Sequence, residues 1–270
     1  LLAQLILRRP GAATTADQAL ALAGELARLL DQAHTERCGL DRLASLAPDQ
    51  YAEHWQVTLQ FLSLLTEHWP RILEDEGAID PARRRDLLLG QIAARWRATP
   101  PKGPVLIAGS TGSVKATADL MQVVASLPLG AVILPGFDRA GLEADHAAIA
   151  QDPAHPQHTL ALLLDRLGVA PGDVPDWPEG IVAPRPARAA LLSAAMRPAK
   201  ATDAWRDLPA ADPGAVAEVR RLDCPNPREE AAAIALMLRE TLETPDRTAA
   251  LVTPDRALAR RVAVELRRWG

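Results

Sequence analysis

The chain has 270 residues, of which 48% are hydrophobic and 24% are charged. This balance is typical of a folded globular protein and excludes extended disorder. The formal net charge of −4 gives the whole chain no basic footprint for nucleic acid, although a local basic face stays open. The two separate cysteines, Cys38 and Cys224, exclude a zinc ribbon or a disulfide framework and indicate a reducing, cytoplasmic compartment.

We expect neither a membrane span nor an export signal in this sequence. No apolar run approaches the roughly 18 residues that a transmembrane helix needs, so we expect no membrane partner. Residues 1–7 are apolar, but neither a basic segment nor a cleavage pattern flanks them, so we do not expect a signal peptide. Because the chain begins at Leu1 rather than Met and stops at Gly270 at the end of a helical pattern, we expect a fragment of a longer protein.

Residues 1–99 predict an all-helical subdomain. Thr15 followed by Gln18 is a capping-box pattern, and leucines recur at helical spacing after it. A second helix is expected over residues 49–69, where Pro70 would interrupt or kink it. The pair Asp80-Pro81 predicts the start of a third helix. One side of this helix is expected to carry Leu88, Ile92 and Trp96.

Residues 100–212 predict an α/β domain. The apolar runs 105–108 and 130–136 are typical of strands buried on both faces, and a helix is expected between them over 115–126. A strand, a helix and a strand within about 30 residues form a βαβ unit with a parallel sheet. Further helices are expected over 156–168 and 186–196.

Residues 213–270 predict the start of a second α/β domain. Strands are expected over 215–222 and 248–253. A helix over 228–242 would connect them, and a last helix would begin at Pro254-Asp255 and end at Trp269.

The loop that follows the first strand is the clearest candidate for chemistry. Its sequence, Gly109-Ser-Thr-Gly-Ser-Val-Lys115, is rich in glycine and precedes a helix, so its backbone N–H groups could hold a phosphate. It is not a P-loop, because Val114 precedes the lysine and Ala116 follows it. The alternative is a tight turn with a Ser or Thr cap.

Other polar clusters indicate structure rather than catalysis. Metal-like spacing is shared by Asp152, His155 and His158, with His146 nearby, but prolines interrupt any common helical face, so we interpret the group as a polar loop. Trp55, Trp69 and Trp96 have the spacing of core anchors. No catalytic residue, nucleotide-binding residue or metal ligand is assigned.

Six ordered segments across the chain resemble one family. They are Ala108–Ser113, Ala131–Gly136, Asp152–His158, Ala195–Pro198, Arg228–Ala231 and Thr248–Arg256. Together they are similar to the AddB subunits of bacterial AddAB helicase–nucleases, in the alphaproteobacterial form. The resemblance places the chain in the helicase-like N-terminal half of that subunit. It implies a superfamily 1 helicase-like core, with 100–212 as part of the first α/β domain and 213–270 as the start of the second.

The resemblance implies a non-catalytic role in the repair of DNA double-strand breaks. The fragment would handle single-stranded DNA and dock an AddA-type helicase–nuclease subunit during end resection. The family's nuclease domain, with its iron–sulfur cluster and Mg²⁺, would lie further along the chain, so no cofactor is expected here. Where a working helicase has an acid and a glutamine that sense nucleotide, this chain reads Ala108-Gly-Ser-Thr111.

Two strand-to-helix turns would meet DNA phosphates at the carboxyl edge of the expected sheet. Their candidate contact residues are Ser110, Thr111, Ser113 and Lys115 in the first turn, and Thr253 and Arg256 in the second. Two other functions stay open. One is a nucleotide-hydrolysing α/β enzyme that uses the 109–115 loop. The other is a structural scaffold that docks a motor subunit and never touches DNA.

Overall fold

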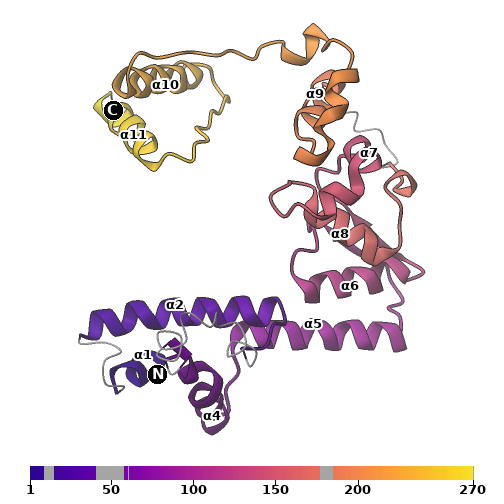
Figure 1. The fold of residues 1–270 in the computed structure, drawn as a ribbon, viewed down its shortest axis with the longest axis vertical. Helices are drawn as coiled ribbons and strands as arrows, with labels where there is room; N and C mark the ends of the chain where they lie inside the picture. The colour runs from indigo at the N-terminus through magenta and orange to yellow at the C-terminus, as the bar shows by residue number, and fades with distance from the viewer. Residues whose placement is uncertain (9–14, 41–57, 60, 177–184, 270) are drawn as a thin grey trace. The chain divides into compact units, whose positions relative to one another are not determined.

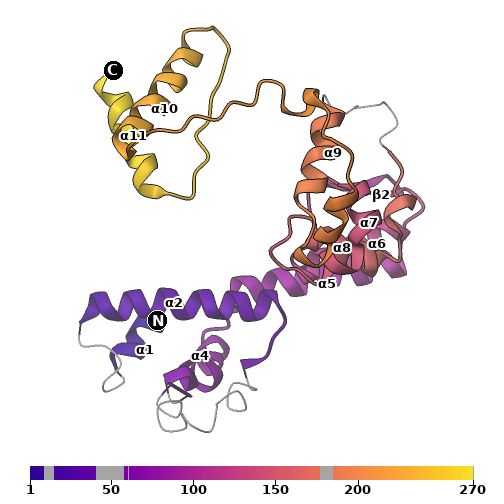
Figure 2. The ribbon, with the colours of Figure 1, turned by 45° about the horizontal axis from the view of Figure 1, so that its top comes forward.

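The computed structural model describes residues 1–8, 15–40, 58–59, 61–176 and 185–269. Its contacts divide the chain into two compact units, Leu1–Ala211 and Asp212–Gly270. The ribbon in Figure 1 is coloured along the chain, and Figure 2 turns the same ribbon by 45°. Each unit is described by itself below.

The expected parallel-sheet α/β fold with a superfamily 1 helicase-like core is wrong. The described residues are mostly helical, and they contain a single sheet of two strands. The sequence patterns predicted two further strands, over 215–222 and 248–253, but in the structure neither segment pairs with a strand among the described residues. An apolar run becomes a strand only where a neighbouring strand satisfies its backbone groups.

The first helices of the chain pack around a small leucine-rich core. Helix α1 spans Leu2–Leu7 and helix α2 spans Ala16–Thr35. The capping prediction is confirmed, because Thr15 Oγ1 accepts a hydrogen bond from the Gln18 N–H at 3.3 Å. The core between these helices is formed by Leu2, Ile6, Ala19, Leu26, Leu30, Leu64 and Leu65.

The second expected helix lies only partly within the described residues. Residues 49–57, which include Trp55, lie outside them. A π-helical turn, η3, spans Leu64–His68 and leads into helix α4, which spans Trp69–Asp75. Pro70 does not break helix α4, because it lies in the first turn of that helix, where a backbone N–H donor is not needed.

Helix α5 spans Pro81–Ala98 and packs against α2 and, further along, against α6. Figure 1 shows the end of α2 beside the start of α5, with α6 next to α5. The expected apolar side of α5 is not its buried side, because Leu88 is 47% exposed and Ile92 is 37% exposed. The buried residues of α5 are instead the small Ala82 and Ala93, which let neighbouring helices approach closely.

The βαβ prediction is confirmed. Strand β1 (Val105–Ala108) pairs in parallel with strand β2 (Gly130–Ile133), in a register that joins Val105 to Gly130 and Ala108 to Ile133. Helix α6, which spans Lys115–Ser126, connects them. The expectation that both faces are buried is wrong, since Leu106 is 62% exposed.

The remaining helices of the first unit follow the sheet. Helix α7 (Arg139–Ala150), which the sequence patterns missed, packs against helix α8 (His158–Leu167). The short turn η4 spans Pro171–Asp173, helix α9 spans Pro186–Ala195 and the 3₁₀ segment η5 spans Ala199–Asp207. Apolar cores beside these helices contain Met121, Leu142, Ile149, Leu160, Leu163 and Leu164.

The second unit is a helical pair rather than an α/β domain. After the turn η6 (Pro213–Val216), helix α10 (Pro227–Leu242) packs against helix α11 (Arg256–Arg268). Their shared core is formed by Ala231, Ala235, Leu258 and Val262. In the expected second strand of this unit, Leu251 packs against the core and Val252 is 91% exposed. Among the described helices, none is both long and apolar enough to cross a membrane.

Candidate nucleic-acid interface

The glycine-rich turn after β1 is closed by its own hydrogen bond. Gly109 and Gly112 have left-handed backbone angles, with φ of 77° and 68°. Ser110 Oγ accepts a hydrogen bond from the Gly112 N–H at 3.2 Å. The N-cap of α6 is Val114, and no described side chain caps that helix, so Ser113 does not act as the cap. Thr111 is half-buried and Ser113 is exposed.

Lys115, in the first turn of α6, is bound to another part of the chain. Its Nζ donates a hydrogen bond to the backbone carbonyl of Glu36 at 2.5 Å and lies 3.5 Å from Glu36 Oε2. The lysine therefore joins the first turn of α6 to the C-terminal end of α2. Because its charge is already paired, this turn has no free cation for a phosphate among the described residues.

A chain of ion pairs lies next to this contact between the end of α2 and the start of α6. Arg37 follows Glu36 and bridges two carboxylates, Asp86 on α5 at 2.7 Å and Asp119 on α6 at 2.6 Å. Arg166 on α8 reaches the other oxygen of Asp119, also at 2.7 Å. The hydrogen bond to Asp86, followed by that to Asp119, raises the pKa of Arg37 above its ordinary value. The pairs hold α2, α5, α6 and α8 together.

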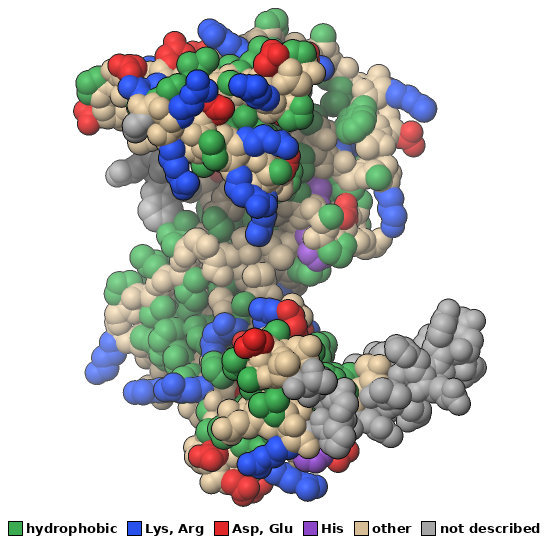
Figure 3. All heavy atoms as spheres, turned by 90° about the vertical axis from the view of Figure 1, so that its left-hand side faces the viewer, with side chains coloured by type: hydrophobic (Ala, Val, Ile, Leu, Met, Phe, Trp, Pro, Cys, Tyr) green, Lys and Arg blue, Asp and Glu red, His purple; other side chains and the backbone are tan. Residues whose placement is uncertain are grey.

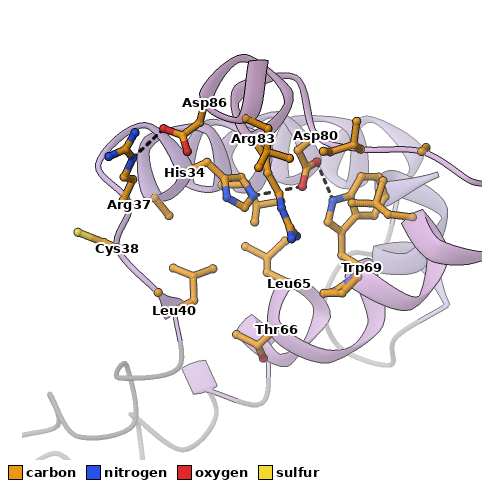
Figure 4. A pocket seen from close by; sticks show the side chains of 18 of the residues that line it. His34, Arg37, Cys38, Leu40, Leu65, Thr66, Trp69, Asp80, Arg83 and Asp86 are labelled. Atoms are coloured by element: carbon orange, nitrogen blue, oxygen red, sulfur yellow. Dashed lines mark hydrogen bonds and ion pairs between the residues drawn. The ribbon is translucent and has the colours of Figure 1, made fainter. Parts of the chain in front are cut away.

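A groove lined in part by Arg37 and Asp86 has a volume of about 810 Å³ and lies between α2, α4 and α5. Figure 4 shows its main polar group, Asp80, pointing to two partners. One Asp80 oxygen lies 3.2 Å from His34 Nε2, and the other accepts a hydrogen bond from Trp69 Nε1 at 3.0 Å. These side chains satisfy one another, so the arrangement stabilises the packing of three helices and is not a catalytic constellation.

The polar side chains of the histidine-rich loop contact separate groups. His155 Nε2 lies 2.8 Å from the carbonyl oxygen of Met196, and His158 Nδ1 lies 3.2 Å from that of Ile149. His146 Nε2 lies 3.3 Å from Asp165. Asp152 accepts a hydrogen bond from the Ala154 N–H. Among the described residues, no group of three or more side chains could hold a metal ion.

The second candidate turn caps helix α11. Thr253 Oγ1 accepts a hydrogen bond from the Asp255 N–H at 3.1 Å, and Asp255 Oδ1 accepts one from the Ala257 N–H at 2.7 Å. Thr253 is half-buried and therefore acts mainly on its own turn. Arg256 is exposed, and its guanidinium has no hydrogen-bond or ion-pair partner in the described part of the chain.

Arg256 is the first residue of an arginine stripe, which we define as Arg256, Arg260 and Arg267. At 3.6 residues per turn, these three positions lie within about 40° of one another and span about 16 Å. Leu258 and Val262, which face α10, lie on the opposite side of the helix. All three arginines are exposed, and none forms an ion pair with a described acid. Figure 3 shows Lys and Arg side chains in the upper part of the view, among acidic and hydrophobic side chains.

Sequence reasoning found Arg256 but missed Arg260 and Arg267. The signal was present, because positions 256, 260 and 267 fall on one helical face, but only Arg256 followed an expected strand-to-helix turn. Helix α11 carries five arginines and one acid, Glu265. That acid lies 3.5 Å from Arg268, outside the stripe.

The structure groups the candidate residues by unit. Ser110, Thr111, Ser113 and Lys115 share one turn of the first unit, and Thr253 and Arg256 share one turn of the second. No protein-family model, curated protein or solved structure matches the chain.

Proposed function

We propose that the chain is a non-catalytic part of an AddB-type subunit and binds single-stranded DNA without sequence preference. It would act in the bacterial cytoplasm, where an AddA-type motor subunit resects broken DNA ends before recombination. The six segments that resemble the family support this assignment. The observation that carries DNA binding is the arginine stripe on α11.

The stripe has the chemistry that a phosphate backbone requires. Guanidinium groups donate hydrogen bonds to phosphate oxygens and stay charged at every physiological pH. Their charge is available here because described acids do not neutralise it. Between the arginines the helix presents small side chains, Ala259 and Ala263, which allow a backbone to approach. Contacts of this kind position a strand and do not read its bases.

The alternative of nucleotide hydrolysis receives less support. It needs the Lys115 ammonium at a phosphate, whereas that group is bound to Glu36. The scaffold alternative differs from our proposal in one measurable property, which is affinity for DNA.

A pair of variants tests the proposal. We expect R256A/R260A/R267A to lose most of the affinity of the parent chain for a fluorescein-labelled oligothymidylate, measured by anisotropy. The control is R221A/R239A/R268A, which removes the same charge from arginines that pair with Asp223, Glu243 and Glu265. It should bind nearly as the parent does. If R256A/R260A/R267A and the parent bound the oligothymidylate with equal affinity, the proposal would be wrong and the scaffold alternative would be favoured.

A further inference from the structure

One ion pair in the first unit is largely buried. Arg197 Nη2 lies 2.6 Å from Asp145 Oδ1, and the two side chains are 19% and 6% exposed. Arg197 belongs to the Ala195–Pro198 segment that the sequence singled out, and it lies between α9 and η5. Asp145 lies within α7, 52 residues earlier.

The pair is only partly satisfied. Asp145 Oδ2 and Arg197 Nε are buried and have no hydrogen-bond partner among the described residues. The backbone at Asp145 also leaves helical geometry, with φ of −131° and ψ of 21°. A buried charge pair with unmet groups gains little net free energy from its attraction, because desolvation offsets it. The pair therefore fixes a position more than it adds stability.

The segment that Arg197 holds buries little apolar surface. We define the strap as residues 186–207, which contain α9 and η5. Helix α9 and η5 contain no fully buried residue, and Pro198 between them is buried. Polar contacts to the strap include those from His155 to the Met196 carbonyl and from Lys200 to Gln151. Large apolar side chains of the strap remain exposed, including Leu192 and Trp205. Segments with so little buried apolar surface open at low free-energy cost.

We propose that the strap is detachable and that the Asp145–Arg197 pair is the clasp that closes it. Residues 208–211 lead from the strap directly into the second unit. Opening the clasp therefore lengthens the chain that carries the arginine stripe and extends the distance over which that stripe searches for DNA. The existence of the clasp does not depend on the proposed function. The longer reach of the arginine stripe toward DNA rests on the proposed function.

Hydrogen exchange measured by mass spectrometry tests the clasp. We expect R197A and D145N to raise exchange in residues 186–207 at least about tenfold, with exchange in α2 and α6 unchanged. The control is R206A, which breaks the exposed pair between Arg206 and Asp203 on the same strap and should change nothing. Equal exchange in the clasp variants and the parent would overturn the proposal. So would a matching rise in α2 and α6, or unfolding of R197A, because the pair would then belong to the core.

A second variant keeps the test independent of unfolding. D145L/R197M replaces the pair by apolar side chains of similar size, so strap exchange should be as slow as in the parent or slower. If the strap of D145L/R197M exchanged as fast as that of R197A, this would contradict the claim that an unpaired buried charge opens the strap. The tether is tested by proteolysis of residues 186–211, which should be faster in R197A than in the parent and not faster in R206A. Unchanged cleavage in R197A would refute the lengthening.

Discussion

Lys115 donates a hydrogen bond to the carbonyl of Glu36 at 2.5 Å and so ties the first turn of α6 to the end of α2. Sequence alone favoured Lys115 as a phosphate contact because it follows a glycine-rich turn. Its partner lies 79 residues earlier in the chain, and only the folded structure brings the two residues together.

We expect Lys115→Ala to leave affinity for single-stranded DNA unchanged and to lower stability by about 1 kcal/mol. The lysine is 42% exposed, so water already screens much of its attraction to Glu36. For a chain of this size, that loss corresponds to a fall in Tm of about 2–4 °C. The control is Lys102→Ala, because Lys102 is exposed and has no partner among the described residues. A large loss of DNA affinity in K115A alone would restore the first turn as a contact surface.

Arg37→Met should destabilise the first unit more than K115A does, by about 1–2 kcal/mol, because water screens part of each of its two ion pairs. The change leaves Asp86 without its partner and removes one of two cations from Asp119. Because the pKa of Arg37 is raised, its contribution is complete at neutral pH and is lost only as the pH rises through the folded-state value. The difference in free energy of unfolding between parent and variant should therefore stay constant between about pH 6 and pH 9. Urea unfolding at several pH values checks this, and a difference that shrinks within that range would contradict it.

Two glycines in the same turn separate backbone strain from packing. A Cβ at Gly112 would lie 3.0 Å from Leu163 Cδ1, whereas a Cβ at Gly109 would meet nothing within 4 Å. Both residues have positive φ, so alanine adds about 1 kcal/mol of strain at either position. We expect Gly112→Ala to cost at least about 1 kcal/mol more than Gly109→Ala, because it also overpacks Leu163. Equal costs, measured by thermal unfolding, would show that α8 moves aside without penalty.

Local signals in the sequence predicted much of the structure. The Thr15 cap, the limits of α6 and the first strand depend on neighbouring residues, and all three predictions are confirmed. A strand also needs a partner strand, which local sequence does not reveal. Val252 is of a residue type that favours strands, but in the second unit it lies exposed. The outward face of α5 likewise depends on which neighbour packs against it, and composition does not reveal that.

The candidate interface was only partly predictable for the same reason. Arg256 was found from its place after a turn, and the helical spacing to Arg260 and Arg267 was available in the sequence. Whether those arginines are free depends on where the acids lie. Glu265 sits beside Arg268 rather than the stripe, which is a property of the folded helix.

The salt dependence of DNA binding tests the central claim most directly. Each phosphate contact to a single strand contributes about 0.7 to the slope of log affinity against log salt concentration. We therefore expect R256A/R260A/R267A to reduce the slope of the parent by about 2 units, and the control variant R221A/R239A/R268A to keep it. A parent chain with no measurable affinity for oligothymidylate at low salt, or equal slopes for all three proteins, would contradict the assignment of the arginine stripe as the DNA-binding surface.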